Sequence, residues 1–150
     1  MKNSIVFLSL IAISLLWECT CEPSNSIEGV WEAQYLEWSN ADTTFIFEKS
    51  DTKGQIKTFT KGYFSFVNQN PDMDTTGRHI ISGGSGIYTL LGDTLTEKML
   101  LSPWPGMRGK PLSYQVKISN DTLFQIFPYP GCTAETWKEW TGKEIYIRIE

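Results

Sequence analysis

The feature that most constrains the fold of this chain is a succession of short strand patterns with no long helical pattern among them. From residue 30 onward, runs of five to nine residues rich in aromatic and β-branched side chains alternate with turn residues. No helical pattern is longer than about two turns, which argues against the mixed helix and sheet classes. The predicted strands are residues 30–38, 44–48, 55–60, 63–68, 87–91, 94–101, 112–119, 122–127 and 144–149.

Three of the links between these strands have the chemistry of tight hairpin turns. They contain Gly92-Asp93, Asn120-Asp121 and Lys61-Gly62, residues that tolerate positive φ at the centre of a turn. Hairpins connect antiparallel neighbours, and a long antiparallel meander removes its exposed edges most simply by closing into a barrel. The sequence therefore predicts an all-β fold, an antiparallel up-and-down β-barrel of about eight to nine strands.

The first segment predicts an export signal. Lys2 precedes an apolar and small stretch over residues 5–17, which is shorter than the roughly 20 residues of a membrane-spanning helix. We assign residues 1–21 to the signal and 22–150 to one barrel domain, exported to the periplasm, the outer membrane or the medium. Leu16 lies three residues before Cys19, as in a lipoprotein signal, but Trp17 and Glu18 do not fit. Lipidation at Cys19 and simple secretion both remain open.

Charge and cysteine content exclude several classes of function. The mature domain keeps the formal net charge of −4, which disfavours nucleic acid and anionic lipid. Cys21 and Cys132 are a possible disulfide pair in an exported compartment. Three cysteines and the single histidine, His79, match no zinc motif. We expect no metal and no cofactor.

The chain resembles the small exported lipocalin-like (calycin) domains of Gram-negative bacteria. The residues that carry the resemblance are Gly29-Val30-Trp31 and the segments 59–66, 83–90, 92–97, 121–123 and 146–148. The resemblance implies that Arg148 on the last strand packs its guanidinium over the ring of Trp31, with Gly29 in the same structural motif. Tyr146 stands where such domains usually have a tryptophan.

The aromatic residues of the strands are the candidate ligand-binding residues. Large side chains with a few hydroxyl groups can line a cavity of roughly 300 Å³ or more, although small barrels are often packed solid. The candidates are Tyr35, Phe47, Phe64, Phe66, Tyr88 and Tyr114. A cavity and a filled interior both remain open.

No residue set amounts to an active site, so we expect a protein that is not an enzyme. His79 has no nucleophile elbow beside it, and no spacing identifies a carboxylate pair among residues such as Glu97 and Glu135. The leading hypothesis is therefore an exported barrel that binds a small apolar or amphipathic molecule in its interior. The alternative is a surface module that binds glycan or protein through the loop tryptophans Trp104, Trp137 and Trp140.

Overall fold

The computed structural model describes residues 26–128 and 140–150, and most of them belong to one antiparallel sheet. The predicted signal, Cys19, Cys21, Cys132, Glu135 and Trp137 lie outside the described residues. The strands are β1 (Gly29–Ser39), β2 (Thr44–Glu48), β3 (Gly54–Thr60), β4 (Tyr63–Met73), β5 (His79–Leu91), β6 (Thr94–Leu101), β7 (Pro111–Ser119), β8 (Thr122–Pro128) and β9 (Thr141–Arg148). A single 3-10 turn, η2 (Pro105–Met107), links β6 to β7. No helix in these two ranges is long and apolar enough to cross a membrane.

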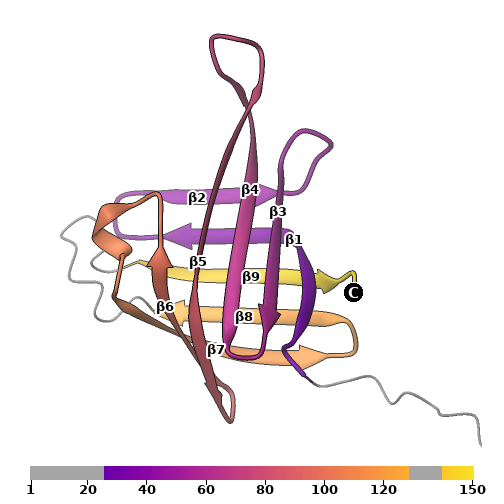
Figure 1. Cartoon of the computed structure of the whole chain (residues 1–150), viewed down its shortest axis with the longest axis vertical. Coiled ribbons are helices and arrows are strands. Elements are labelled where there is room, and N and C mark those ends of the chain that lie inside the picture. The colour runs from indigo at the N-terminus through magenta and orange to yellow at the C-terminus, as the bar shows by residue number, and fades with distance from the viewer. Residues whose placement is uncertain (1–25, 129–139) are drawn as a thin grey trace, which may run out of the picture.

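The sheet closes on itself because β1 pairs with both ends of the meander. The first half of β1 pairs with β3, and β9 pairs along the other side of β1 from Trp31↔Arg148 to Ser39↔Thr141. Eight strands thus form a closed antiparallel barrel, and β2 is an extra strand beside the second half of β1. In Figure 1, β1, β2, β8 and β9 run across the view, while β3, β4 and β5 run nearly at right angles to them. The predicted all-β fold, an antiparallel up-and-down barrel, is confirmed.

The three predicted hairpin turns are present, with positive φ where the sequence indicated it. Lys61 and Gly62 have φ of 44° and 83°, Gly92 has 62° and Asn120 has 52°. Each turn joins two strands that pair directly, β3–β4, β5–β6 and β7–β8. These local signals therefore set the strand order along most of the barrel.

Strands β4 and β5 are longer than the sequence predicted. They continue as a paired ribbon to Met73↔His79, beyond the predicted strands 63–68 and 87–91. The Asp74 side chain accepts hydrogen bonds from the backbone of Thr76 (2.8 Å) and Arg78 (3.0 Å), which shapes the turn. The ribbon extends well beyond the barrel at the top of Figure 1.

The glycines of residues 83–86 occupy a crowded part of β5. A Cβ at Gly84 would lie 2.8 Å from the Leu101 carbonyl and 2.9 Å from the Phe66 ring. The register with β6 shifts between Ser85 and Gly86. The glycines thus permit a bulge and bring β5 close to its neighbours.

The core at one end of the barrel is apolar and tightly packed. Trp31, Leu95 and Leu123 are fully buried, and Phe59 and Phe64 are 1% and 2% exposed. Trp31 lies near the start of β1, so we call this the closed end. The opposite end of β1, which contains Trp38, contributes to the site described next.

Candidate functional site

The barrel contains a pocket at the end opposite Trp31. Its free volume is about 70 Å³, enough for a few water molecules. The lining residues come from β1, β3, β4, β6, β7, β9 and the β6–β7 link. They are Trp38, Gln55, Lys57, Phe66, Asn68, Glu97, Met99, Trp104, Met107, Leu112, Tyr114, Glu144 and Tyr146.

One wall of this pocket is apolar. The Trp104 and Phe66 rings stack with their centroids 6.3 Å apart and their planes 13° from parallel. Met99, Met107 and Leu112 are each buried beside them in the lining. Trp104 precedes η2 in the link between β6 and β7, and this link holds its ring over Phe66. An aromatic ring that belongs to no strand thus lines the pocket.

The other part of the lining is a buried polar cluster, which sequence reasoning missed. Lys57 Nζ lies 2.7 Å from Glu97 Oε1, and the two side chains are 4% and 3% exposed. Lys57 also donates to Gln125 Oε1 at 3.1 Å. Four rings surround the ammonium at 5.1 to 5.9 Å from their centroids, those of Phe59, Phe64, Tyr114 and Tyr146.

A second carboxylate belongs to the same cluster. Glu144 is 5% exposed and accepts hydrogen bonds from the Tyr146 hydroxyl (2.6 Å) and from Trp38 Nε1 (3.2 Å). Gln55 Nε2 donates to the Tyr146 hydroxyl at 2.9 Å. Tyr146 thus uses its hydroxyl to join Gln55 to Glu144.

The pKa of Glu97 is raised above its ordinary value. Burial disfavours the charged form, and the nearby Glu144 carboxylate acts in the same direction. Lys57 and a hydrogen bond from Tyr114 oppose the rise without cancelling it. The site therefore holds one carboxyl group paired with the ammonium, Glu97, and a second one nearby, Glu144, both in a region of low solvent access.

Two of the six predicted ligand-binding residues, Phe66 and Tyr114, line this pocket. Phe64 and Tyr88 lie toward the closed end, where their ring centroids are 6.3 and 5.1 Å from that of Phe59. Phe47 is buried below Lys53, whose Nζ is 4.7 Å from the ring centroid. Contact of any of these residues with a ligand stays a prediction.

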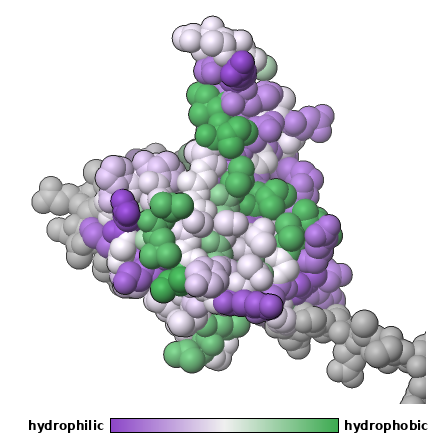
Figure 2. All heavy atoms as spheres, in the orientation of Figure 1, coloured by the Kyte–Doolittle hydropathy of each residue, from purple (hydrophilic) through white to green (hydrophobic). Residues whose placement is uncertain are grey.

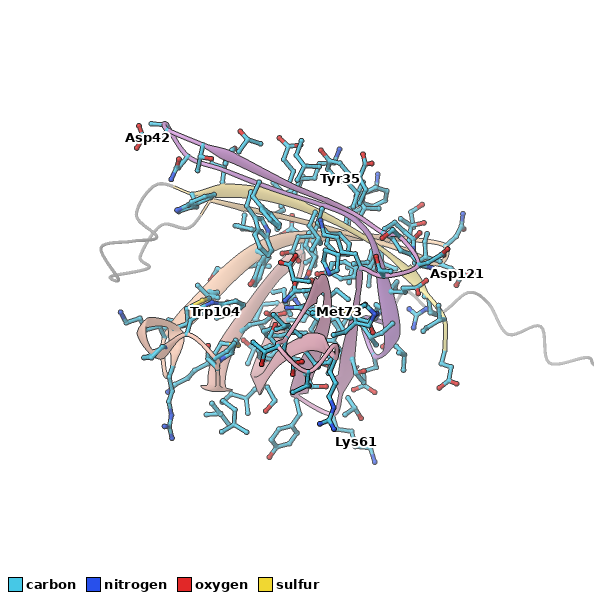
Figure 3. The ribbon with its side chains drawn as sticks, turned by 90° about the horizontal axis from the view of Figure 1, so that it is seen from above. Tyr35, Asp42, Lys61, Met73, Trp104 and Asp121 are labelled. Atoms are coloured by element: carbon cyan, nitrogen blue, oxygen red, sulfur yellow. The ribbon has the colours of Figure 1, made fainter. Side chains whose placement is uncertain are left out.

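Tyr35 does not lie on the inner face of the barrel, although the sequence pattern grouped it with Trp31 and Ala33. The register of β1 against β9 shifts between Ala33 and Tyr35, and this bulge reverses the alternation, so that Leu36 is buried. Figure 3 shows Tyr35 on the outer side of the β1 and β2 layer, where its hydroxyl donates to Glu37 at 2.6 Å.

The polar cluster had a signal in the sequence. In each of β3, β6, β8 and β9, one position of the inward-facing set holds a polar residue, with buried residues two positions away on the same face. These polar residues are Lys57 (two before Phe59), Glu97 (between Leu95 and Met99), Gln125 (between Leu123 and Phe127) and Glu144 (two before Tyr146). A buried charge needs a partner, so this pattern predicts that such residues meet. The strand alternation alone does not identify which ones.

Several apolar side chains face outward from β4, β5 and β6. Val67, Ile81 and Leu101 are 51%, 57% and 62% exposed, and Figure 2 shows apolar patches on this side of the molecule. They alternate with inward residues and contribute nothing to the pocket lining. Within residues 26–128 and 140–150, no group of three or more His, Cys, Asp or Glu side chains is placed to hold a metal ion.

In comparisons with known proteins, this chain is similar to two solved structures. One is a lipocalin-like protein from Bacteroides uniformis ATCC 8492, with 18% sequence identity over 82% of this chain and 98% of that chain and a TM-score of 0.49. The other is an uncharacterised protein from Bacteroides eggerthii DSM 20697, with 16% identity over 82% of this chain and 99% of that chain and a TM-score of 0.45. No family model and no curated protein matches the chain. The chain is thus similar to a lipocalin-like protein in its all-β architecture.

Proposed function

We propose that this protein binds a small amphipathic molecule non-covalently in the pocket at the Trp38 end of the barrel. The observation that carries the proposal is the division of one pocket into an apolar wall, with Phe66 and Trp104, and a buried polar cluster, with Lys57 and Glu144. Ligand sites typically combine an apolar lining with a few placed polar groups that orient the guest. The site offers binding groups, and we assign it no catalytic step.

Trp104, one of the three loop tryptophans of the alternative surface-binding hypothesis, belongs to this pocket. Trp104 is 37% exposed, but one face of its ring stacks on Phe66 and it lines the pocket. Trp140 is half-buried. These observations favour a role of Trp104 in the pocket mouth. A role of the loop tryptophans in a flat surface that binds glycan or protein stays a prediction.

The experiment is a titration of the folded protein with a neutral apolar fluorescent probe. We expect saturable enhancement with one site per chain. Met107→Trp fills space in the lining, so it should lower probe affinity by roughly tenfold, which corresponds to about 1.4 kcal/mol. The matched control is Leu101→Trp, since Leu101 is 62% exposed and absent from the lining.

Thermal unfolding of both variants separates loss of the site from loss of the fold. Absence of saturable uptake by the wild-type protein contradicts the proposal. Equal loss of affinity in Met107→Trp and Leu101→Trp contradicts the assignment to this pocket.

A further inference from the structure

The charges that line the pocket do not balance. Lys57 is the ammonium, and it faces Glu97 at 2.7 Å. Glu144 is a second carboxylate, only 5% exposed, and its hydrogen-bond donors among the described residues are the neutral groups Trp38 Nε1 and Tyr146 Oη. A buried carboxylate without a cation is costly, so Glu144 is the place in this pocket where an added positive charge gains most.

The hydrogen-bonding groups of the pocket are unequally engaged. The Tyr146 hydroxyl donates to Glu144, Trp38 Nε1 donates to the same carboxylate, and Lys57 faces Glu97 and Gln125. In contrast, Asn68 Oδ1 is buried and accepts no hydrogen bond from the described residues.

Glu97 is already engaged. Its Oε1 lies 2.7 Å from Lys57 Nζ in a close ion pair, and hydrogen bonds from Lys57 and Tyr114 act on the same carboxyl group. One buried donor, Gln125 Nε2, lacks a partner, but Gln125 is fully buried and does not line the pocket. The acceptor of the lining that is short of a donor is therefore Asn68 Oδ1.

Aromatic rings surround these acceptors. Trp38, Phe66, Trp104, Tyr114 and Tyr146 all line the same pocket, and aromatic faces attract organic cations. A carboxylate-headed guest, by contrast, faces the like charge of Glu144, while the lysine that would attract it is already paired with Glu97. An alcohol satisfies an acceptor but leaves the charge of Glu144 unbalanced.

We propose that the ligand of this pocket is an amphipathic organic cation, a primary amine whose ammonium pairs with Glu144 and whose apolar part packs against Phe66 and Trp104. This inference rests on the proposed function and names its ligand class. The ammonium supplies the missing positive charge beside Glu144 and brings hydrogen-bond donors into the pocket, while Lys57 keeps its pairing with Glu97.

The test compares three ligands with the same apolar part and different head groups, namely 2-phenylethylamine, 2-phenylethanol and 3-phenylpropionate. Each displaces the neutral fluorescent probe from the wild-type protein at neutral pH. We expect the amine to bind roughly tenfold or more tightly than the alcohol, and the carboxylate to bind most weakly. This order is measured without any variant, so it does not depend on whether a substitution disturbs folding.

Two variants then assign the preference to Glu144. Glu144→Gln should bring the ratio of amine to alcohol affinity close to one, since it removes the charge and keeps the size. Glu48→Gln makes the same change at an exposed position on β2 outside the lining and should keep the wild-type ratio. A ratio unchanged in Glu144→Gln overturns the role of Glu144.

The outcomes separate the two proposals. If the probe and 2-phenylethanol bind but 2-phenylethylamine binds no better than the alcohol, the cation inference is overturned while the pocket function stands. If neither the probe nor any of the three ligands binds, both proposals are overturned.

Discussion

The two ends of this barrel satisfy their polar groups in different ways. At the closed end, Arg148 lies 4.2 Å over the Trp31 ring centroid and donates to the carbonyls of Glu28 and Ser26, both at 2.6 Å. Trp31 Nε1 donates to the Ile27 carbonyl at 2.8 Å. At the pocket end, charged side chains face one another and Asn68 Oδ1 lacks a donor among the described residues.

The difference indicates that, within one sheet, the closed end stabilises the fold and the pocket end offers groups for binding. Backbone carbonyls of the segment before β1 are fixed acceptors, so Arg148 also ties that segment to the last strand. Side chains from separate strands are instead available to a guest. The contact of Arg148 with Trp31, which the resemblance implied, is confirmed and belongs to the structural end.

The largest effect that we expect is at the closed end. Trp31 is fully buried, so Trp31→Ala should lower the free energy of unfolding by about 3–5 kcal/mol, measured by urea denaturation. Leu91→Ala, at a position 78% exposed, is the control and should stay within about 0.5 kcal/mol of wild type. An unchanged midpoint in Trp31→Ala would break the assignment of this end as the structural one.

At the pocket end, removal of the buried cation should be nearly as severe. Lys57→Met leaves Glu97 buried without its partner, which typically costs about 3 kcal/mol or more. The double variant Lys57→Met/Glu97→Gln removes the charge as well and should recover much of the loss. A double-mutant cycle in urea measures this coupling; strictly additive effects would contradict a coupled pair.

A smaller effect is expected from Arg148→Met. The substitution keeps an apolar side chain over Trp31 but removes the cation–π contact and two charged donors, for a loss of about 1–3 kcal/mol. Urea denaturation of Arg148→Met beside Trp31→Ala ranks the two. If Arg148→Met lowers the free energy of unfolding more than Trp31→Ala does, the hydrogen bonds of Arg148 to residues 26–28, rather than the buried Trp31 ring, contribute most of the stability of the closed end.

The smallest expected effect concerns pH and sharpens the contrast between the ends. The pKa of Glu97 is raised by burial and by Glu144 against Lys57 and Tyr114. The folded protein therefore holds this proton at a pH where the unfolded chain, with a pKa near 4.5, releases it. The contribution is present below pH 4.5 and is lost as pH rises through the folded pKa.

Glu97→Gln should accordingly flatten the fall in unfolding free energy above pH 4.5, measured by urea denaturation at a series of pH values. Glu48→Gln, at an exposed position, is the control and should keep the wild-type slope. Equal slopes in wild type and Glu97→Gln would mean that the proton of Glu97 is not linked to folding.

Local sequence patterns determined most of the strands and turns. Alternation with a period of two predicts strands because it places one face in the core, and residues such as Gly92 and Asn120 predict tight turns because they adopt positive φ. These signals act within a few residues, so they needed no knowledge of the rest of the chain. The Trp31 and Arg148 pair followed from a resemblance that covers the whole domain.

Only the tertiary structure decided the composition of the site. A single bulge after Ala33 turned Tyr35 outward and Leu36 inward, because one extra residue reverses the faces of a strand. Closure of the barrel brought Lys57, Glu97 and Glu144 from β3, β6 and β9 into one cluster. The sequence marks each of them as a polar residue at an inward position, but which charges meet depends on strand register and barrel closure, and these are set by the packing of the whole sheet.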